Sequence, residues 1–176
     1  MRIVVYGNSG SGKSTLARSI SANSKLEYLD LDTLAWTGGT PPERRPLEES
    51  HRHIASFNAA HPNWIIEGCY ATLISHASQW ATDLVFLNPG IEACLQNCRS
   101  RPWETHKYRS QEEQDKNLSM LLDWVSQYET RDDEYSYQEH KRIFDNFQKP
   151  KTELASNTET RAFTTKLRTA LSTSLE

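Results

Sequence analysis

The chain of 176 residues lacks any apolar run that approaches the length of a membrane-spanning helix, which needs about 20 residues. It also lacks an excess of positive charge, because 20 lysines and arginines stand against 23 aspartates and glutamates, for a formal net charge of −3. An acidic chain offers no electrostatic reason to bind duplex DNA or an anionic membrane surface. We therefore expect no membrane association, and nucleic acid is an unfavoured partner.

Cysteine is scarce, and its spacing predicts neither disulfides nor a zinc site. Cys69, Cys94 and Cys98 are odd in number and show no paired spacing. Cys94 and Cys98 lie four residues apart, so we expect them to share one face of a helix as small buried side chains. The N-terminus carries no charged segment followed by an apolar stretch of signal-peptide length. These absences favour a reduced, cytoplasmic protein.

The apolar pattern predicts one domain, residues 1–176, in which strands alternate with helices. Continuous apolar runs are typical of strands that are covered on both faces, and strand candidates occur at residues 3–6, 25–30, 63–68, 82–87 and 152–155. Apolar residues at helical spacing predict helices at residues 14–20, 47–60, 89–101, 118–128, around 143–147 and after Ser156, where Glu159 completes a capping box. This alternation predicts a parallel sheet with its ligand site beyond the carboxyl ends of the strands.

The most informative segment is residues 7–14, which matches the pattern G-x-x-x-x-G-K-[ST] of a phosphate-binding loop. It directly follows a strand candidate and runs into a helix candidate, as this motif requires. Gly7, Gly10 and Gly12 let backbone N–H groups approach phosphate oxygens with no Cβ in the way. The alternative, a glycine-rich turn that carries a lysine by chance, does not explain why every position is filled in the right context.

The candidate nucleotide-binding residues are those of the loop and the first turn of the helix: Gly7, Asn8, Ser9, Gly10, Ser11, Gly12, Lys13, Ser14 and Thr15. Lys13 supplies a mobile positive charge for the β- and γ-phosphates, and the Ser14 hydroxyl is placed to ligate Mg²⁺. The N–H groups at the start of the helix add partial positive charge at the same point. The segment thus predicts a site for a nucleoside triphosphate with Mg²⁺.

Three carboxylates follow two other strand candidates on the expected ligand side. Asp30 and Asp32 come at the end of the second strand, and Glu67 ends the third. One aspartate could hold a Mg²⁺-bound water while the other orients or deprotonates an acceptor hydroxyl, and Glu67 could support the metal through water. The structural alternatives are a helix cap or turn for the aspartates and a surface position for Glu67. We take Asp32 as a catalytic candidate, and Asp30 and Glu67 as metal candidates.

Arg99 and Arg101 begin a basic, aromatic-rich cluster, and Arg131 follows it. This composition also suits single-stranded nucleic acid, but acidic residues at 112–115 cancel the positive field. A helical lid over about residues 99–131, which brings these arginines to the transferring phosphates as catalytic groups, explains the cluster better. A solvated charged face is the alternative for each arginine taken singly.

With these residues in view, the sequence resembles the small phosphate-loop kinases related to adenylate kinase and shikimate kinase. More narrowly, it is similar to the adenylate-kinase-like branch called DNA topology modulation proteins. The resemblance covers roughly residues 1–160 and rests on the phosphate loop, Asp32 four residues before Trp36, the run from Trp64 to Tyr70, and Arg131-Asp132.

The resemblance implies a three-layer α/β/α fold with a five-stranded parallel sheet in the order 2-3-1-4-5. It also implies ATP as phosphate donor, Mg²⁺, and adenine held near residues 156–158. The acceptor-binding segment, about residues 33–62, departs from the family, because it shows neither an AMP-pocket pattern nor the glycines and arginines of shikimate recognition. Within it, Arg44 and Arg45 could grip an anionic acceptor.

Two functions remain in view. The first is an ATP- and Mg²⁺-dependent phosphotransferase that moves the γ-phosphoryl group to a nucleotide-, nucleoside- or shikimate-like acceptor. The second is a nucleotide-gated binding protein with slow ATPase activity, which the lack of a recognisable acceptor pocket supports; its protein partner is unknown. DNA binding follows from the name of the related branch and not from these residues, since the chain is acidic and shows no helix-turn-helix signal.

Overall fold

The computed structural model describes residues 1–39, 42–103 and 109–173. Within these ranges, five parallel strands form one sheet in the order β2-β3-β1-β4-β5. The strands are β1 (Arg2–Gly7), β2 (Glu27–Asp30), β3 (Trp64–Gly68), β4 (Asp83–Leu87) and β5 (Lys151–Leu154). The α/β class and the strand order are therefore confirmed. Residues 40–41 of the expected acceptor segment and 104–108 of the expected lid lie outside the description.

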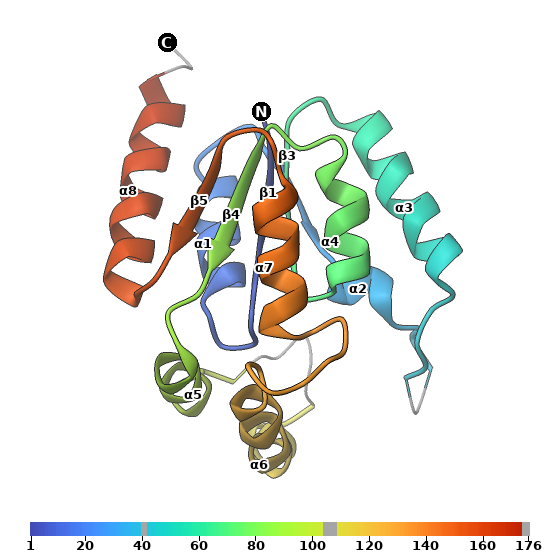
Figure 1. Ribbon diagram of the computed structural model, residues 1–176, viewed down its shortest axis with the longest axis vertical. Helices are drawn as coiled ribbons and strands as arrows, with labels where there is room; N and C mark the ends of the chain where they lie inside the picture. Colours follow the sequence, from blue (N-terminus) through green and yellow to red (C-terminus); the bar gives the residue numbers. More distant parts are fainter. Residues whose placement is uncertain (40–41, 104–108, 174–176) are drawn as a thin grey trace.

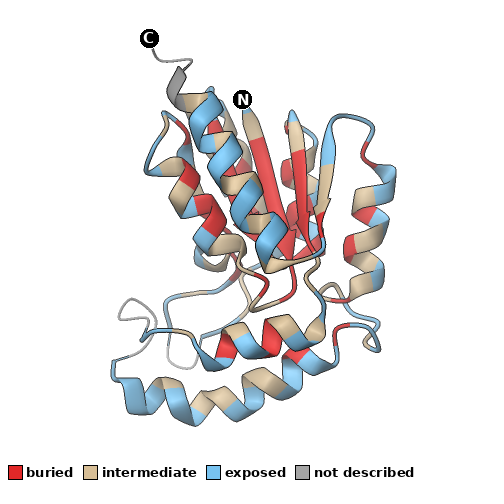
Figure 2. Cartoon of the chain, turned by 90° about the vertical axis from the view of Figure 1, so that its left-hand side faces the viewer, coloured by how far each residue is buried: buried red, intermediate tan, exposed pale blue. Residues whose placement is uncertain are grey.

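The central strand β1 is buried on both of its faces, which explains its apolar sequence. Val4 and Tyr6 belong to one buried cluster, whereas Ile3 and Val5 belong to another. Because successive side chains of a strand point to opposite faces, a strand that is apolar at every position needs a helical layer on both sides. The buried residues accordingly concentrate in the strands and on the helix faces turned toward them (Figure 2).

Helices cover both faces of the sheet (Figure 1). The first face carries α1 (Lys13–Ser21) and α8 (Asn157–Thr173), and the second carries α3 (Leu47–Ala60), α4 (Ala71–Ser78) and α7 (Tyr137–Asn146). The sequence did not predict α4, a short helix that begins without a side-chain cap at Tyr70. A short helix, α2 (Asp32–Ala35), follows β2.

Two helices, α5 (Ile91–Arg99) and α6 (Gln111–Ser126), lie beyond the carboxyl ends of the strands (Figure 1). They pack against each other through a third apolar cluster, in which Cys94 and Cys98 are buried together with Val125. All three cysteines of the chain are free thiols. Helix α6 begins seven residues earlier than residue 118, because the Ser110 hydroxyl caps it by accepting a hydrogen bond from a backbone N–H in its first turn.

The final helix begins where its capping signal predicts. Ser156 Oγ accepts a hydrogen bond of 3.1 Å from the backbone N–H of Glu159, and the Glu159 carboxylate accepts one of 2.8 Å from the N–H of Ala155. Over the part of the chain that the structure describes, helices long and apolar enough to cross a bilayer are absent.

Candidate functional site

The register of the sheet brings the candidate residues to one edge. Strand β1 runs directly into the phosphate-binding loop, and its neighbour β3 ends at Gly68, which pairs with Tyr6. Strand β2 lies on the other side of β3, where Asp30 pairs with Glu67. The phosphate loop, both aspartates and Glu67 thus lie at the carboxyl end of three adjacent strands.

Glycine is required in the phosphate loop for two different reasons. A Cβ on Gly7 would lie 2.2 Å from the Leu87 carbonyl oxygen, and one on Gly10 would lie 2.4 Å from the Cys94 carbonyl oxygen. Gly12 has open space around it, but its φ of 93° favours glycine at the N-cap of α1. The loop is therefore pressed against β4 and α5 on one side and turns sharply into α1 on the other.

Side-chain amides hold the phosphate loop against α5 and α6. Asn8 Nδ2 donates to the Val125 carbonyl oxygen at 3.1 Å, which joins the loop to α6. Asn97 Nδ2 donates to the Gly10 carbonyl oxygen at 2.8 Å and exchanges amide hydrogen bonds of 3.1 Å with Asn157. Sequence reasoning missed Asn97, because nothing in its helix marks one polar residue as a partner of the distant loop.

The interior of the loop suits an anionic ligand. Ser11 Oγ is buried and has no hydrogen-bond partner among the described residues, so an acceptor from a ligand would complete it. Lys13 Nζ lies 3.4 Å from the Asn8 carbonyl oxygen. Of the other loop candidates, Ser9 and Ser14 are half-buried and Thr15 is exposed.

Lys13 lies in a field of acidic groups. Burial alone would lower the pKa of Lys13, but the electrostatic influence of Cys69, Glu67 and Asp32 outweighs burial and raises it. Burial raises the pKa of the Cys69 thiol to about 12.

Glu67 and Asp30 have partners within the protein. Glu67 is 1% exposed and accepts a hydrogen bond of 2.9 Å from Tyr28 Oη. Asp30 Oδ1 accepts one of 2.9 Å from the backbone N–H of Asp32, which is the turn role that sequence analysis left open. Arg18 Nη2 lies 3.9 Å from Asp30 Oδ2.

These carboxylates and Ser14 form no complete metal cage. Among the described residues, no group of three or more His, Cys, Asp or Glu side chains is placed to hold a metal ion. Mg²⁺ in phosphate sites commonly keeps several waters and takes only one or two protein ligands besides the phosphates. The small number of protein ligands is compatible with that mode of binding, and the metal roles of Ser14, Asp30 and Glu67 stay predictions.

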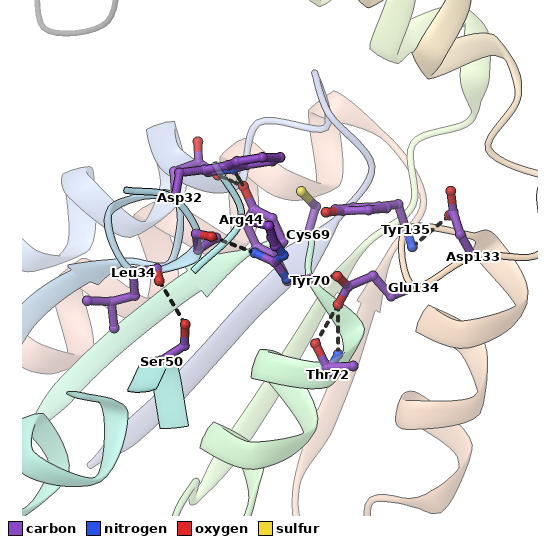
Figure 3. Close-up of polar contacts among 12 residues, drawn as sticks. Asp32, Leu34, Arg44, Ser50, Cys69, Tyr70, Thr72, Asp133, Glu134 and Tyr135 are labelled. Atoms are coloured by element: carbon purple, nitrogen blue, oxygen red, sulfur yellow. Dashed lines mark hydrogen bonds and ion pairs between the residues drawn. The ribbon is translucent and has the colours of Figure 1, made fainter. Parts of the chain in front are cut away.

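Asp32 is hydrogen-bonded to Tyr70 (Figure 3), and Tyr70 in turn to Trp36. Tyr70 Oη donates to Asp32 Oδ1 at 2.7 Å, and Trp36 Nε1 donates to Tyr70 Oη at 2.8 Å. The Arg44 guanidinium lies over the Tyr70 ring, 4.6 Å from its centroid. In the sequence, Trp36 and Tyr70 carried the family resemblance but no assigned role.

The three candidate arginines have different surroundings. Arg101 is half-buried, and its positive charge acts on Lys13 to lower its pKa, against the acidic groups. Arg99 is exposed at the last residue of α5. The Arg131 side chain is 8% exposed, and its guanidinium lies 3.4 Å from the centroid of the Trp124 ring. Its Nε has no hydrogen-bond partner in the described part of the chain and lies 3.8 Å from Asp133 Oδ1.

The two arginines of the acceptor segment are engaged by the protein itself. Arg44 forms an ion pair of 2.7 Å with Glu134 and donates to the Ala35 carbonyl oxygen at 3.1 Å. Arg45 donates to the carbonyl oxygens of Leu34 and Trp36 and pairs with Glu49. These contacts hold the segment in place, and the anion-gripping role that we expected stays a prediction.

Comparisons with known proteins match the structure but not the sequence. No protein-family model matches the chain, and no curated protein matches its sequence. A shikimate kinase from Acinetobacter baumannii, solved in complex with shikimate, is similar with 15% identity and a TM-score of 0.51 over 99% of this chain and 94% of that chain. A shikimate kinase from Bacteroides thetaiotaomicron is similar with 14% identity and a TM-score of 0.51 over 97% and 98% of the two chains.

A third similar structure is the YorR protein from Bacillus subtilis in complex with phosphorylated GDP. It shares 12% identity with this chain, with a TM-score of 0.51 over 96% of this chain and 94% of that chain. Identities this low show a common fold and no more. The chain has the three-layer fold of the phosphate-loop kinases, and the narrower resemblance to the DNA topology modulation branch stays a prediction.

Proposed function

We propose that this protein is an ATP- and Mg²⁺-dependent phosphotransferase that moves the γ-phosphoryl group to a small-molecule acceptor of nucleotide-, nucleoside- or shikimate-like chemistry. One observation carries the proposal: a complete phosphate loop, with the unpartnered Ser11 hydroxyl and the cationic Lys13, lies beside Asp32 at the ligand edge of the sheet. The fold supports it, because two of the similar structures are shikimate kinases.

In this proposal each residue of the edge has a separate task. The loop N–H groups and Lys13 hold the β- and γ-phosphates, and the Ser14 hydroxyl ligates the metal, with Asp30 and Glu67 holding its waters. Mg²⁺, when bound, neutralises charge on the phosphate oxygens. Asp32 accepts the proton of the acceptor hydroxyl as the new oxygen–phosphorus bond forms and the bond to the ADP oxygen breaks.

The arginines and the flanking segments complete the proposed site. Arg101 is assigned to the transferring phosphates, with Arg99 and Arg131 as further lid arginines over about residues 99–131. Adenine is assigned to residues 156–158, next to the amide pair of Asn97 and Asn157. We further propose that the acceptor occupies the segment 33–62 of a single domain, and that the protein is cytoplasmic, where free thiols persist.

ATP consumption with Mg²⁺ tests this function. The purified protein is assayed alone and with a panel of nucleoside monophosphates, nucleosides, shikimate and small sugars, with Lys13→Ala in parallel. We expect consumption to rise with one acceptor and to vanish in Lys13→Ala, whose circular dichroism stays that of the wild type. Undiminished turnover in a folded Lys13→Ala protein overturns the proposal.

The engagement of Arg44 and Arg45 by the protein itself favours a second candidate, a nucleotide-gated binding protein. Such a protein hydrolyses ATP slowly while its nucleotide state controls a partner surface. A basal rate that ignores every acceptor in the panel, but rises with a protein partner, supports this second function over the first.

A further inference from the structure

Asp32, Tyr70 and Trp36 form a hydrogen-bonded chain with a fixed direction. An indole N–H can only donate, so Trp36 Nε1 donates to Tyr70 Oη at 2.8 Å. The Tyr70 hydroxyl has one hydrogen, and it points to Asp32 Oδ1 at 2.7 Å. The chain therefore runs from Trp36 through Tyr70 to Asp32, and each donor orients the next group.

Among these three hydrogen-bonded residues, Asp32 is the group that can exchange a proton. Burial, together with the neighbouring Cys69 and Asp32, raises the pKa of the Tyr70 phenol above its ordinary value. The phenol therefore keeps its proton at physiological pH and donates to the carboxylate without becoming a base. Tyr70 can influence proton transfer only through Asp32.

The Tyr70 ring is held on several sides. It is 4% exposed, with the Arg44 guanidinium 4.6 Å from its centroid and the Tyr135 ring edge-on at 5.4 Å. Arg44 is itself fixed by Glu134, which also accepts a hydrogen bond from the Thr72 hydroxyl (Figure 3). The hydroxyl of Tyr70 therefore has one stable position.

Asp32 needs such external support because of where it lies. It is the first residue of α2, a helix of four residues that begins without a side-chain cap. So short a helix has few internal hydrogen bonds to hold a side chain in one rotamer. The connection between β3 and α4, which carries Tyr70, supplies a fixed donor from the opposite side of the site.

We propose that Tyr70, oriented by Trp36, is the positioning residue for Asp32. Its hydroxyl fixes the plane of the carboxylate, so that Asp32 meets an acceptor hydroxyl in one orientation. The consequence for catalysis rests on the proposed function, in which Asp32 takes the acceptor proton. The hydrogen-bonded chain itself does not depend on that function.

The first experiment tests the hydrogen bonds among Trp36, Tyr70 and Asp32 and needs no acceptor. The indole Nε1–H resonance of Trp36 is assigned in the ¹⁵N-labelled protein and compared with Asp32→Asn and Tyr70→Phe at one pH. We expect both variants to shift this resonance upfield, because the hydrogen bond to Tyr70 is weakened in the first and lost in the second. Trp64, whose Nε1 donates to Asn58 Oδ1 at 3.2 Å, provides an internal resonance that stays in place. A Trp36 resonance that ignores Asp32→Asn overturns the proposal.

The second experiment measures transfer to the acceptor that the ATP panel identifies. Tyr70→Phe is expected to lower kcat by roughly 10²-fold with little change in KM for ATP, since a misplaced reacting group can cost that much. The matched control is Tyr6→Phe, which removes an equally buried hydroxyl that donates to the His140 carbonyl oxygen at 3.2 Å. Equal losses of kcat in the two variants contradict a positioning role. If no acceptor is phosphorylated, the proposed function is wrong. The shift of the Trp36 indole resonance then tests the hydrogen bonds from Trp36 through Tyr70 to Asp32 by itself.

Discussion

His140 Nε2 lies 2.9 Å from the carbonyl oxygen of Cys69, so a fully buried imidazole is attached to the backbone directly before Tyr70. On the other side of the ring, Nδ1 lies 2.7 Å from Tyr128 Oη. A carbonyl oxygen can only accept, so Nε2 carries the hydrogen and Nδ1 accepts from the phenol. Both ring nitrogens of the neutral imidazole are therefore satisfied, and protonation at Nδ1 would reverse the bond to Tyr128 and leave the phenol hydrogen in need of another acceptor.

This arrangement predicts a loss of stability in mild acid. Burial lowers the pKa of His140 to about 4, whereas an unfolded histidine titrates near its ordinary 6.5. Between these values the unfolded chain binds more protons than the folded one, so stability falls as pH decreases from about 6.5 toward 4. The His140 contribution to that fall is about 3 kcal/mol. Urea unfolding at a series of pH values measures it.

His140→Gln is the control for this pH dependence. The variant is less stable at pH 7, because it loses the imidazole packing, but its stability should vary less between pH 6.5 and 4. An unchanged slope in His140→Gln would assign the acid sensitivity to another group.

Alanine substitutions should separate crowding from backbone strain in the phosphate loop. A Cβ on Gly10 would lie 2.4 Å from the Cys94 carbonyl oxygen and 2.6 Å from Cys98 Sγ, and Gly10 also has a φ of 78°. Gly12 shares the positive φ but has open space, so Gly12→Ala should cost only about 1–2 kcal/mol of unfolding free energy. Gly10→Ala should cost more, as measured by thermal or urea unfolding without ligand.

Gly38→Ala serves as the neutral reference, because Gly38 has open space and no positive φ. Equal stability of Gly10→Ala and Gly12→Ala would mean that α5 shifts away from the new Cβ at little cost in free energy.

The candidate arginines should differ in their effect on transfer. Arg101 acts on Lys13 through its charge, whereas Arg99 is exposed. Arg101→Ala should lower kcat by on the order of 10³-fold, the lower end of what an arginine at a transferring phosphate contributes. Arg99→Ala, its matched control, should stay within a few fold of the wild type. The two variants are compared by steady-state kinetics, and equal effects would refute this difference.

The pair Arg44–Glu134 should show measurable coupling. The two side chains are 32% and 23% exposed and 2.7 Å apart, so the solvent screens them only in part. A double-mutant cycle with Arg44→Ala and Glu134→Ala should give a coupling free energy of about 1 kcal/mol or slightly more, above the range of fully exposed pairs. A coupling near zero would show that Arg44 acts on Tyr70 and Trp36 alone.

Local sequence patterns were sufficient for the framework of the fold. The apolar runs of β1, β3 and β4 predict strands covered on both faces, and the strand–loop–helix context of residues 7–14 places the phosphate loop. The order of the strands came from the family resemblance. Each of these signals lies within a few residues of the chain, where periodicity and turn chemistry operate.

The contacts that organise the site were beyond such reasoning. Tyr70 and Asp32 are 38 residues apart, and Arg44 and Glu134 are 90 residues apart. No periodicity links such positions, because their proximity arises only when the sheet has aligned its strand ends. Helix α4, which has only eight residues, was also missed.

The hydrogen bond from Asn8 to Val125 makes the phosphate loop and α6 parts of one assembly. In a chimera in which the segment 99–131 is exchanged for that of another kinase, Asn8 keeps its hydrogen bond only if the new segment places a backbone carbonyl oxygen where that of Val125 lies. The reverse graft would leave α6 without its anchor. In this chain the phosphate loop and α6 are therefore coupled, and an exchange of segment 99–131 has to preserve the position of that carbonyl oxygen.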